Sequence, residues 1–355
     1  MNQRLLKVQK KIAELELDAL LVTGVENRRY LSGFTGTSAI LLISPAKAFL
    51  ITDFRYLEQA EKQAPDFRVV SSTGLPDEAL ADLVDHEGYR TLGFEADHLT
   101  YQQFKNYGEK MPGVTLKPLR TVIEKFREVK DDQEIQLLRK AVAIADKAFT
   151  HILDFLRPGI TEKEIANELE YYMKTCGAEK SAFDLIIASG SRSALPHGVA
   201  SGKKLAVGDF VVLDFGCVYQ GYHSDMTRTV VLGKASPEQK KIYNIVLEAQ
   251  KRATAAIAPG KVCSEIDAVA RDLIAKEGYG SNFGHGLGHS IGLAIHEKPA
   301  LAPRDQSTLR PGMVVTVEPG IYIRDWGGVR IEDIVVVTGQ SVEVLTQSTK
   351  KLLEL

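Results

Sequence analysis

The sequence is poor in cysteine and contains no motif that would pair the few it has. Cys176, Cys217 and Cys263 are the 3 cysteines among 355 residues, and they are widely spaced. An odd number without a CxxC pair argues against a disulfide framework and against a thiolate zinc site. We therefore expect three free thiols in a reducing compartment, and a cytoplasmic location.

Neither sign of charge is in excess, and long hydrophobic runs are absent. With 44 basic and 46 acidic residues, the net charge is -2. This balance gives no reason to expect nucleic acid or an anionic membrane as a partner. No uninterrupted apolar run reaches membrane-spanning length. At the N-terminus, Leu5, Val8, Ile12 and Leu15 recur at helical spacing among charges, which predicts an amphipathic helix and not a signal peptide.

Residues 1–124 have the pattern of a small α/β domain, and residues 125–355 form the remainder. Apolar strand candidates alternate there with polar helical stretches; they cover residues 19–24, 39–44, 48–53, 67–72 and 91–96. This part contains no cluster of histidine, cysteine or acids that suggests a site. Arg29, Tyr30 and the segment from Asp53 to Tyr56 are expected at exposed strand ends.

Two acids flank a predicted hairpin in LAVGDFVVLDFGCVYQGYHSD, which begins at Leu205. An apolar run ends in Asp214, Gly216 and Gly221 permit a turn, and Asp225 precedes a β-prone segment. The pairing would place both carboxylates at neighbouring positions. Two carboxylates at the end of a buried run are costly unless a cation or a shared proton compensates them. Taken alone, the pair could equally be one strand-end acid and one turn acid.

The same pattern recurs later in the chain. LRPGMVVTVEPG, which begins at Leu309, aligns with LAVGDFVVLDFG and puts Glu318 in the place of Asp214. A second hairpin, IYIRDWGGVRIED, is expected to turn at residues 326–328 and to bring in Glu332. Each copy is preceded by a helix, a Pro-Gly turn, a second helix and a glycine stop. An internal repeat therefore predicts two hairpins, each presenting a pair of carboxylates.

Histidines complete the candidate chemistry. The segment FGHGLGHSIGLAIHE places His285, His289 and His296 among glycines, and it is too glycine-rich for a simple core helix or strand. Four carboxylates and one imidazole suit two divalent ions with carboxylates bridging between them. The acid-rich set favours Mn²⁺, while Co²⁺, Zn²⁺ and Fe²⁺ are chemically possible.

These residues resemble those of the pita-bread-fold metallopeptidases, in the branch of prolidase and Xaa-Pro aminopeptidase. The matching motifs are VVLDFG, GYHSDMTRT, HGLGHSIGLAIHE, TVEPGIY and GGVRIED. The resemblance implies an α+β fold: a pita-bread catalytic domain with an internal pseudo-twofold repeat, preceded by a smaller creatinase-type α/β domain. It also implies five metal ligands: Asp214, Asp225, His289, Glu318 and Glu332. In that scheme Asp225 and Glu332 bridge the two ions.

The resemblance further implies hydrolysis of the Xaa-Pro bond at the N-terminus of dipeptides or short peptides, by a homodimer. Glu318 would move the proton of the attacking water, and His296 would stabilise the oxyanion. His197 and His285 would line the substrate pocket. Arg330 lies on the same strand face as Glu332 and is expected to orient an acid or a substrate carboxylate, or to form a structural salt bridge. His223 is expected to pack behind the ligands.

Other functions of this fold stay open at this stage. A methionyl aminopeptidase shares the ligand set but typically lacks the additional N-terminal domain. A creatinase-like hydrolase works without metal, and some proteins use the fold only for binding. Five intact ligands together with His197 and His296 argue against the last two. The sequence does not distinguish a dipeptidase from an aminopeptidase.

Overall fold

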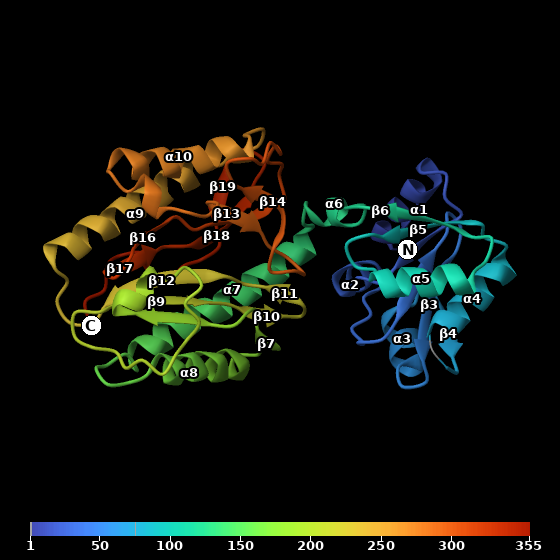
Figure 1. Cartoon of the computed structure of the whole chain (residues 1–355), viewed down its shortest axis with the longest axis horizontal. Coiled ribbons are helices and arrows are strands. Elements are labelled where there is room, and N and C mark those ends of the chain that lie inside the picture. The colour runs from blue at the N-terminus through green and yellow to red at the C-terminus, as the bar shows by residue number, and fades with distance from the viewer. Residues whose placement is uncertain (1, 75) are drawn as a thin grey trace. The chain divides into compact units, whose positions relative to one another are not determined.

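A computed structural model describes residues 2–74 and 76–355. The chain divides into two compact units, Met1–Arg127 and Glu128–Leu355, whose elements are labelled in Figure 1. The assignment of residues 1–124 and 125–355 to two family domains stays a prediction. None of the helices formed by the described residues combines the length and the apolar character that crossing a membrane requires.

The first unit is a six-stranded sheet with helices. The strand order is β4-β3-β2-β1-β5-β6. Its strands are β1 (Ala19–Val22), β2 (Ile40–Ile43), β3 (Ala48–Asp53), β4 (Arg68–Ser72), β5 (Thr91–Glu95) and β6 (Thr115–Leu119). Its helices are α1 (Gln3–Glu14), α2 (Val25–Ser32), α3 (Leu57–Gln63), α4 (Pro76–Glu87), α5 (Tyr101–Lys110) and α6 (Glu124–Arg127). The amphipathic helix α1 and the five expected strands are confirmed. Strand β6 was not expected, because its sequence TLKPL interrupts the apolar residues with polar ones and with a proline, which only the edge of a sheet tolerates.

One expectation for the first unit is wrong. Arg29 and Tyr30 belong to helix α2, which Gly33 ends with a φ of 76°. Tyr30 is buried, with 5% of its surface exposed, and its hydroxyl donates to the carbonyl oxygen of Phe126 at 3.3 Å. The ring is therefore part of the core of this unit. Asp53 ends β3, as expected.

The second unit contains the repeat as two successive copies of one arrangement. The first copy consists of α7 (Asp132–Leu153), α8 (Glu162–Thr175), β8 (Ile186–Ser189), β9 (Phe210–Phe215) and β12 (Met226–Val231). The second consists of α9 (Pro237–Ala256), α10 (Cys263–Lys276), β13 (Gly288–Ser290), β15 (Val314–Val317) and β18 (Asp333–Val337). The sheets run β12-β9-β8 and β14-β13-β15-β18-β19, with β14 (Glu297–Leu301) and β19 (Val342–Val344) added to the second. The central strand of each sheet pairs antiparallel with both neighbours.

Local signals in the sequence explain why the two copies match. Asp131 and Ser236 begin the equivalent helices α7 and α9 with capping boxes, in which side chain and backbone satisfy each other's free donors. After each first helix, Gly159 and Gly260 have φ values of 92° and 84°. Their amides donate to the carbonyls of Leu205 and Leu309, each at 2.9 Å.

Each hairpin turns at only some of the expected residues: Gly221 and Trp326 lie in the turns, whereas Gly216, Gly327 and Gly328 do not. In the first, β10 (Cys217–Tyr219) and β11 (Tyr222–His223) are joined by Gln220 and Gly221, with φ values of 45° and 78°. Gly216 serves a different purpose, because a Cβ there would lie 1.8 Å from the carbonyl oxygen of Ser224. In the second, β16 (Gly320–Ile323) and β17 (Gly327–Arg330) are joined by residues 324–326. Gly328 lies within β17, where a Cβ would meet the carbonyl oxygen of Ser193 at 2.4 Å.

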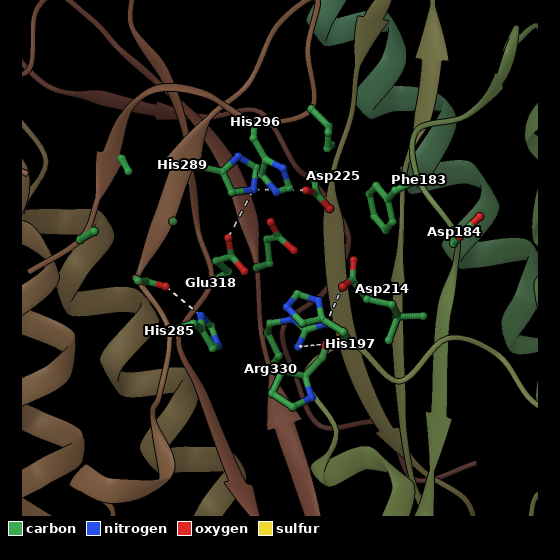
Figure 2. A pocket seen from close by; sticks show the side chains of 18 of the residues that line it. Phe183, Asp184, His197, Asp214, Asp225, His285, His289, His296, Glu318 and Arg330 are labelled. Carbon is green, nitrogen blue, oxygen red and sulfur yellow. Dashed lines mark hydrogen bonds and ion pairs between the residues drawn. The ribbon is translucent and has the colours of Figure 1, made fainter. Parts of the chain in front are cut away.

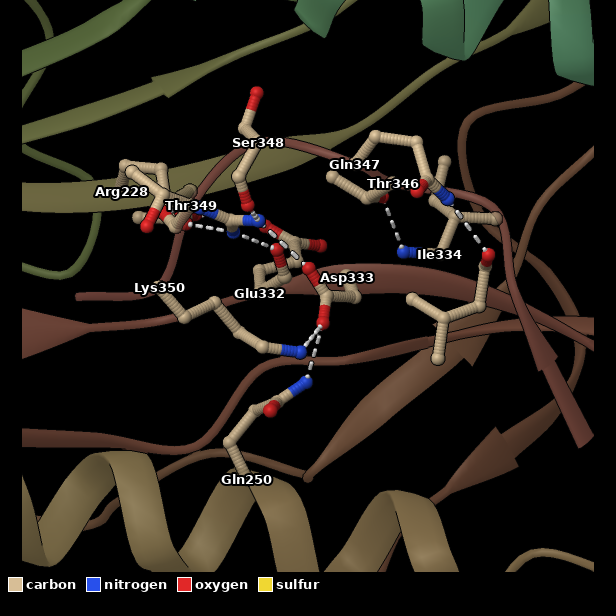
Figure 3. Close-up of polar contacts among 12 residues, drawn as sticks. Arg228, Gln250, Glu332, Asp333, Ile334, Thr346, Gln347, Ser348, Thr349 and Lys350 are labelled. Atoms are coloured by element: carbon tan, nitrogen blue, oxygen red, sulfur yellow. Dashed lines mark hydrogen bonds and ion pairs between the residues drawn. The ribbon is translucent and has the colours of Figure 1, made fainter.

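A buried ion pair joins β12, β18 and the C-terminal segment (Figure 3). Arg228 donates to Asp333 at 2.8 Å, and their side chains are 1% and 0% exposed. The same guanidinium donates to the carbonyls of Thr227, Glu332, Ser348 and Thr349. On its other side, Asp333 accepts from Gln250 and Lys350. Arg228 thus holds three segments that are distant in sequence.

Replacing Arg228 by methionine should destabilise the second unit strongly. Removing one partner of a buried ion pair costs about 3–5 kcal/mol, and here several carbonyls would also lose their donor. Urea unfolding followed by the fluorescence of Trp326, the only tryptophan of the chain, would measure the loss. Arg139→Met is the control, because Arg139 and Glu343 are 36% and 43% exposed and such a pair contributes at most about 1 kcal/mol. Equal losses in the two variants would contradict the assignment.

Candidate metal centre and active site

The second unit contains a cavity of about 590 Å³ at the ends of the strands that the repeat pairs. Nine candidate residues from the sequence line it: His197, Asp214, Asp225, His285, His289, His296, Glu318, Arg330 and Glu332. In Figure 2 the side chains of Asp214, Asp225, His289 and Glu318 point toward one another. The structure therefore brings together every side chain that the sequence proposes for the site.

The strand register explains why the acids converge. Asp214, in β9, pairs with Thr227 of β12, and Asp225 lies two residues before Thr227. In the second copy Glu318 directly follows β15, and Glu332 directly precedes β18. The amide of Glu332 donates to the carbonyl of Thr227 at 3.1 Å, which ties the two copies together at this point.

Three of the carboxylates are buried and lack full hydrogen bonding. Asp214, Asp225 and Glu332 are 7%, 6% and 1% exposed. One oxygen of each has no hydrogen-bond partner among the described residues: Oδ1 of both aspartates and Oε1 of Glu332. Burial raises the pKa of all three carboxyls, and repulsion between the acids adds to this effect. Buried carboxylates with free oxygens are the donor set that a divalent cation requires.

His289 supplies a nitrogen on the same side. Its Nε2 lies 3.6 Å from Oδ2 of Asp225 and 3.5 Å from Oε1 of Glu318. Its Nδ1 lies 3.1 Å from the carbonyl oxygen of Ser290. If Nδ1 carries the proton, Nε2 presents a lone pair to the acids, which is the usual arrangement of a metal-binding imidazole. Ligand atoms of Asp225, His289 and Glu332 all lie within 4.8 Å of one another.

Two threonines that the sequence analysis did not identify orient these groups. The Thr227 hydroxyl donates to Oε2 of Glu332 at 2.7 Å, which leaves Oε1 facing the cavity. The Thr316 hydroxyl donates to Oε1 of Glu318 at 3.1 Å and accepts from the amide of His289 at 3.0 Å. Hydrogen bonds of this kind fix the direction of a ligand before the metal binds.

Arg330 orients an acid, which is one of the roles expected for it. Its guanidinium pairs with Oδ2 of Asp214, and the two side chains are 4% and 10% exposed. It also donates to the Thr227 hydroxyl at 3.0 Å and to the Tyr322 hydroxyl at 2.7 Å. The remaining carboxylate oxygen of Asp214 is the one without a partner.

Tyr322 connects Arg330 to His285, and it too was missed. Burial raises the pKa of Tyr322 to about 12, so the phenol keeps its proton. Burial also lowers the pKa of His285, whose Nδ1 lies 2.8 Å from the carbonyl oxygen of Gly286. The neutral ring therefore donates from Nδ1 and accepts at Nε2 from Tyr322, at 2.9 Å. The signal was available, because Tyr322 in β16 lies diagonal to Arg330 on one sheet face.

His296 and His197 face the acids from two loops. The ring of His296 lies 4.4 Å from that of His289 at an angle of 74°, and burial lowers its pKa. His197 follows η1 (Gly190–Ala194). Its loop is held by the buried Glu162, which accepts from the amides of Ser189 and Ser201 at 2.8 and 3.0 Å.

His223 and an apolar wall complete the surroundings. The amide of His223 donates to the carbonyl oxygen of Gly292 at 2.9 Å, so this residue links the loop after His289 to the segment of Asp225. The cavity lining also includes four apolar side chains that the sequence did not reveal: Phe183, Ile186, Val199 and Ile295. Because the lining combines polar and apolar side chains, the cavity fits a small substrate with both characters.

Comparison with known proteins agrees with this geometry. The family Metallopeptidase family M24 matches residues 136–339, and the Creatinase/Prolidase N-terminal domain matches residues 4–129. The Xaa-Pro dipeptidase of Pyrococcus horikoshii is 41% identical over 305 residues, which is 85% of each chain. The structure of an Xaa-Pro dipeptidase from Bacillus anthracis is 50% identical, with a TM-score of 0.97 and coverage of 99% of both chains.

The structure of an X-Pro aminopeptidase from Thermotoga maritima is also similar. It is 40% identical, with a TM-score of 0.91, and the match covers 97% of this chain and 100% of the other. The family resemblance and the fold class predicted from the sequence are thereby confirmed. With its buried acids, its histidines and its matching N-terminal domain, the chain belongs to metallopeptidase family M24.

Proposed function

We propose that this peptidase cleaves the Xaa-Pro bond at the N-terminus of dipeptides or short peptides, using two divalent cations. The observation that carries the proposal is the convergence of four acids and His289 on one cavity, with three buried carboxylate oxygens left without partners among the described residues. The specificity for proline is supported by the names of the relatives, which are Xaa-Pro dipeptidases and an X-Pro aminopeptidase.

Five residues would hold the cations: Asp214, Asp225, His289, Glu318 and Glu332. Oxygen donors predominate in this set, which favours Mn²⁺ over softer ions. Divalent cations bound there would supply Lewis acidity, which lowers the pKa of water and polarises a carbonyl.

The protein side chains would then divide the proton transfers and the stabilisation of charge. Glu318, whose Oε1 receives a hydrogen bond from Thr316, would accept a proton from the attacking water and return it to the leaving nitrogen. His296, neutral because burial lowers its pKa, would donate its ring N–H to the oxyanion. His197, His285 and Arg330 would border the substrate.

A bond to proline is a demanding substrate for an ordinary peptidase. The amide is tertiary, has no N–H and has a fixed φ, so recognition through that N–H is impossible. Activation of the carbonyl, together with an apolar surface that contacts the proline ring, would allow the bond to be recognised and cleaved without an N–H. The wall formed by Phe183, Ile186, Val199 and Ile295 offers such a surface.

Two further proposals concern the setting of the enzyme. We propose a homodimer, as the family resemblance implies, and a cytoplasmic location. The three cysteines are free, and Cys217 and Cys263 are buried, which agrees with a reducing compartment.

Hydrolysis of a matched pair of peptides would test the function. Chelator-stripped protein, with and without added Mn²⁺, would be given an Xaa-Pro dipeptide and an Xaa-Pro-Yaa tripeptide. Metal-dependent release of the first residue is expected. Cleavage of the dipeptide alone would identify a dipeptidase, and cleavage of the tripeptide an aminopeptidase. Refusal of both peptides, or cleavage of a methionyl peptide instead, would contradict the proposal.

Glu318→Gln should retain the fold and lose nearly all turnover. The amide cannot take up the proton of water, and general base catalysis typically contributes about 10²–10⁴-fold. Steady-state kinetics would measure kcat, and circular dichroism would check the fold. Glu164→Gln is a matched control, since Glu164 is a capping residue on α8. Undiminished turnover in Glu318→Gln would remove this residue from the mechanism.

Asp225→Asn should stabilise the metal-free protein and abolish its response to metal. Folding raises the pKa of Asp225, so its charged form destabilises the metal-free fold at pH 7. The gain should begin to shrink as pH falls below that raised pKa and should vanish only near the ordinary carboxyl pKa of 3.8, where the unfolded chain is protonated as well. Wild-type protein should gain about 2.7 kcal/mol at a free Mn²⁺ concentration of about 100 Kd. Thermal unfolding would measure both effects, and an equal response to Mn²⁺ in the variant would contradict the ligand assignment.

A further inference from the structure

Lys130 is a buried lysine that lies outside the cavity lining and between the two matched family regions. Its ammonium donates to Oε2 of Glu297 at 3.0 Å and to the Ser290 hydroxyl at 3.2 Å. The side chains of Lys130 and Glu297 are 1% and 6% exposed. A lysine so deeply buried must be held by specific partners.

The partners of Lys130 are the immediate neighbours of the two histidines closest to the acids. Ser290 follows His289, and Glu297 follows His296. Ser290 and Glu297 face each other across β13 and β14, with an irregularity in the register between His289 and Ser290. The loop between these strands, residues 291–296, contains no regular secondary structure. One ammonium group therefore holds both ends of this loop.

The contacts of Glu297 and Ser290 extend this hold through the loop. Oε1 of Glu297 accepts from the amide of Ala294 at 3.1 Å. A Cβ on Gly292 would lie 2.8 Å from the same carboxylate, so the loop backbone passes directly over it. The Ser290 hydroxyl, which accepts from Lys130, donates to the carbonyl of Val314 at 2.7 Å.

Lys130 itself is fixed by the turn that leads into β15. Its amide donates to the carbonyl oxygen of Gly312 at 2.9 Å. Gly312 has a φ of 86°, and a Cβ there would lie 2.9 Å from the carbonyl oxygen of Lys130. The lysine is thus anchored at its backbone to the strand that ends next to Glu318, and at its ammonium to the loop of the histidines.

We propose that Lys130 is a positioning residue that sets His289 and His296 relative to the acids. The proposal rests on the proposed function for its consequence in catalysis. Without the ammonium, the buried Glu297 would lose the ion pair that Lys130 supplies, and the glycine-containing loop would lose the contact that joins its ends. Displacement of groups that hold an active-site histidine typically costs about 10- to 100-fold in activity or metal affinity.

Two variants separate positioning from simple loss of stability. Lys130→Met removes the ammonium, and Lys130→Met combined with Glu297→Gln also removes the negative charge of the carboxylate. We expect the double variant to recover thermal stability while kcat on an Xaa-Pro peptide stays about 10- to 100-fold low in both, with KM little changed. Lys47→Met is the control, because Lys47 pairs with Glu87, which at 6% is as little exposed as Glu297. It should leave kcat unchanged.

A second measurement does not depend on activity. Ring signals of ¹⁵N-labelled histidines in metal-free protein, identified through His289→Gln and His296→Gln, should shift for these two residues in both Lys130 variants. The signals of His86 and His151 should stay in place. Unchanged His289 and His296 signals, a wild-type kcat in Lys130→Met, or recovery of kcat together with stability in the double variant would overturn the proposal. If the wild-type enzyme cleaves no Xaa-Pro peptide, the proposed function fails and the ring signals alone decide about Lys130.

Discussion

The structure of the second unit depends on one electrostatic constraint, the burial of several carboxylates around a single cavity. Burial and mutual repulsion raise the pKa of Asp214, Asp225 and Glu332. Burying such a group is costly unless a cation or a shared proton compensates it, so the backbone must impose its position. Here the backbone imposes it twice, because each copy of the repeat ends a central strand with an acid.

The two copies are similar in backbone but differ in the partners of their equivalent acids. Asp214 receives a guanidinium from Arg330. Among the described residues, Glu318, at the corresponding position, accepts a hydrogen bond from a threonine hydroxyl and faces His289. A buried guanidinium thus holds Asp214, whereas a neutral hydroxyl contacts Glu318, and in the proposed mechanism this difference would leave the proton transfer to Glu318. Equivalent carboxylates in unequal surroundings are how one site obtains separate roles from one residue type.

Much of the repeat and of its acidic site could be predicted from the sequence, because the sequence signals for them are local. Capping boxes, glycines with positive φ and the acid at the end of an apolar run each act within a few residues, and their recurrence revealed the repeat. Thr227 and Lys130 could not be found this way. Thr227 contacts Glu332, and Lys130 contacts Glu297, across more than a hundred residues; only the folded chain brings them together. The expected turn positions were only partly right: Gly221 and Trp326 lie in turns, whereas Gly216 and Gly328 accommodate close backbone approaches.

Thr227, Thr316 and Tyr322, which were missed, share one function: each holds a polar atom of an acid, a histidine or Arg330 at the site. In Glu332 and Asp214, one carboxylate oxygen is directed toward the cavity. The other oxygen accepts a hydrogen bond, from Thr227 in the case of Glu332 and from Arg330 in the case of Asp214. A carboxylate that is already fixed by such a hydrogen bond loses little conformational freedom when a cation or substrate binds. The rigidity of the site is therefore set before binding, by hydrogen bonds that do not touch the substrate. Since these bonds connect both copies of the repeat, the cavity is rigid only when the whole second unit is folded.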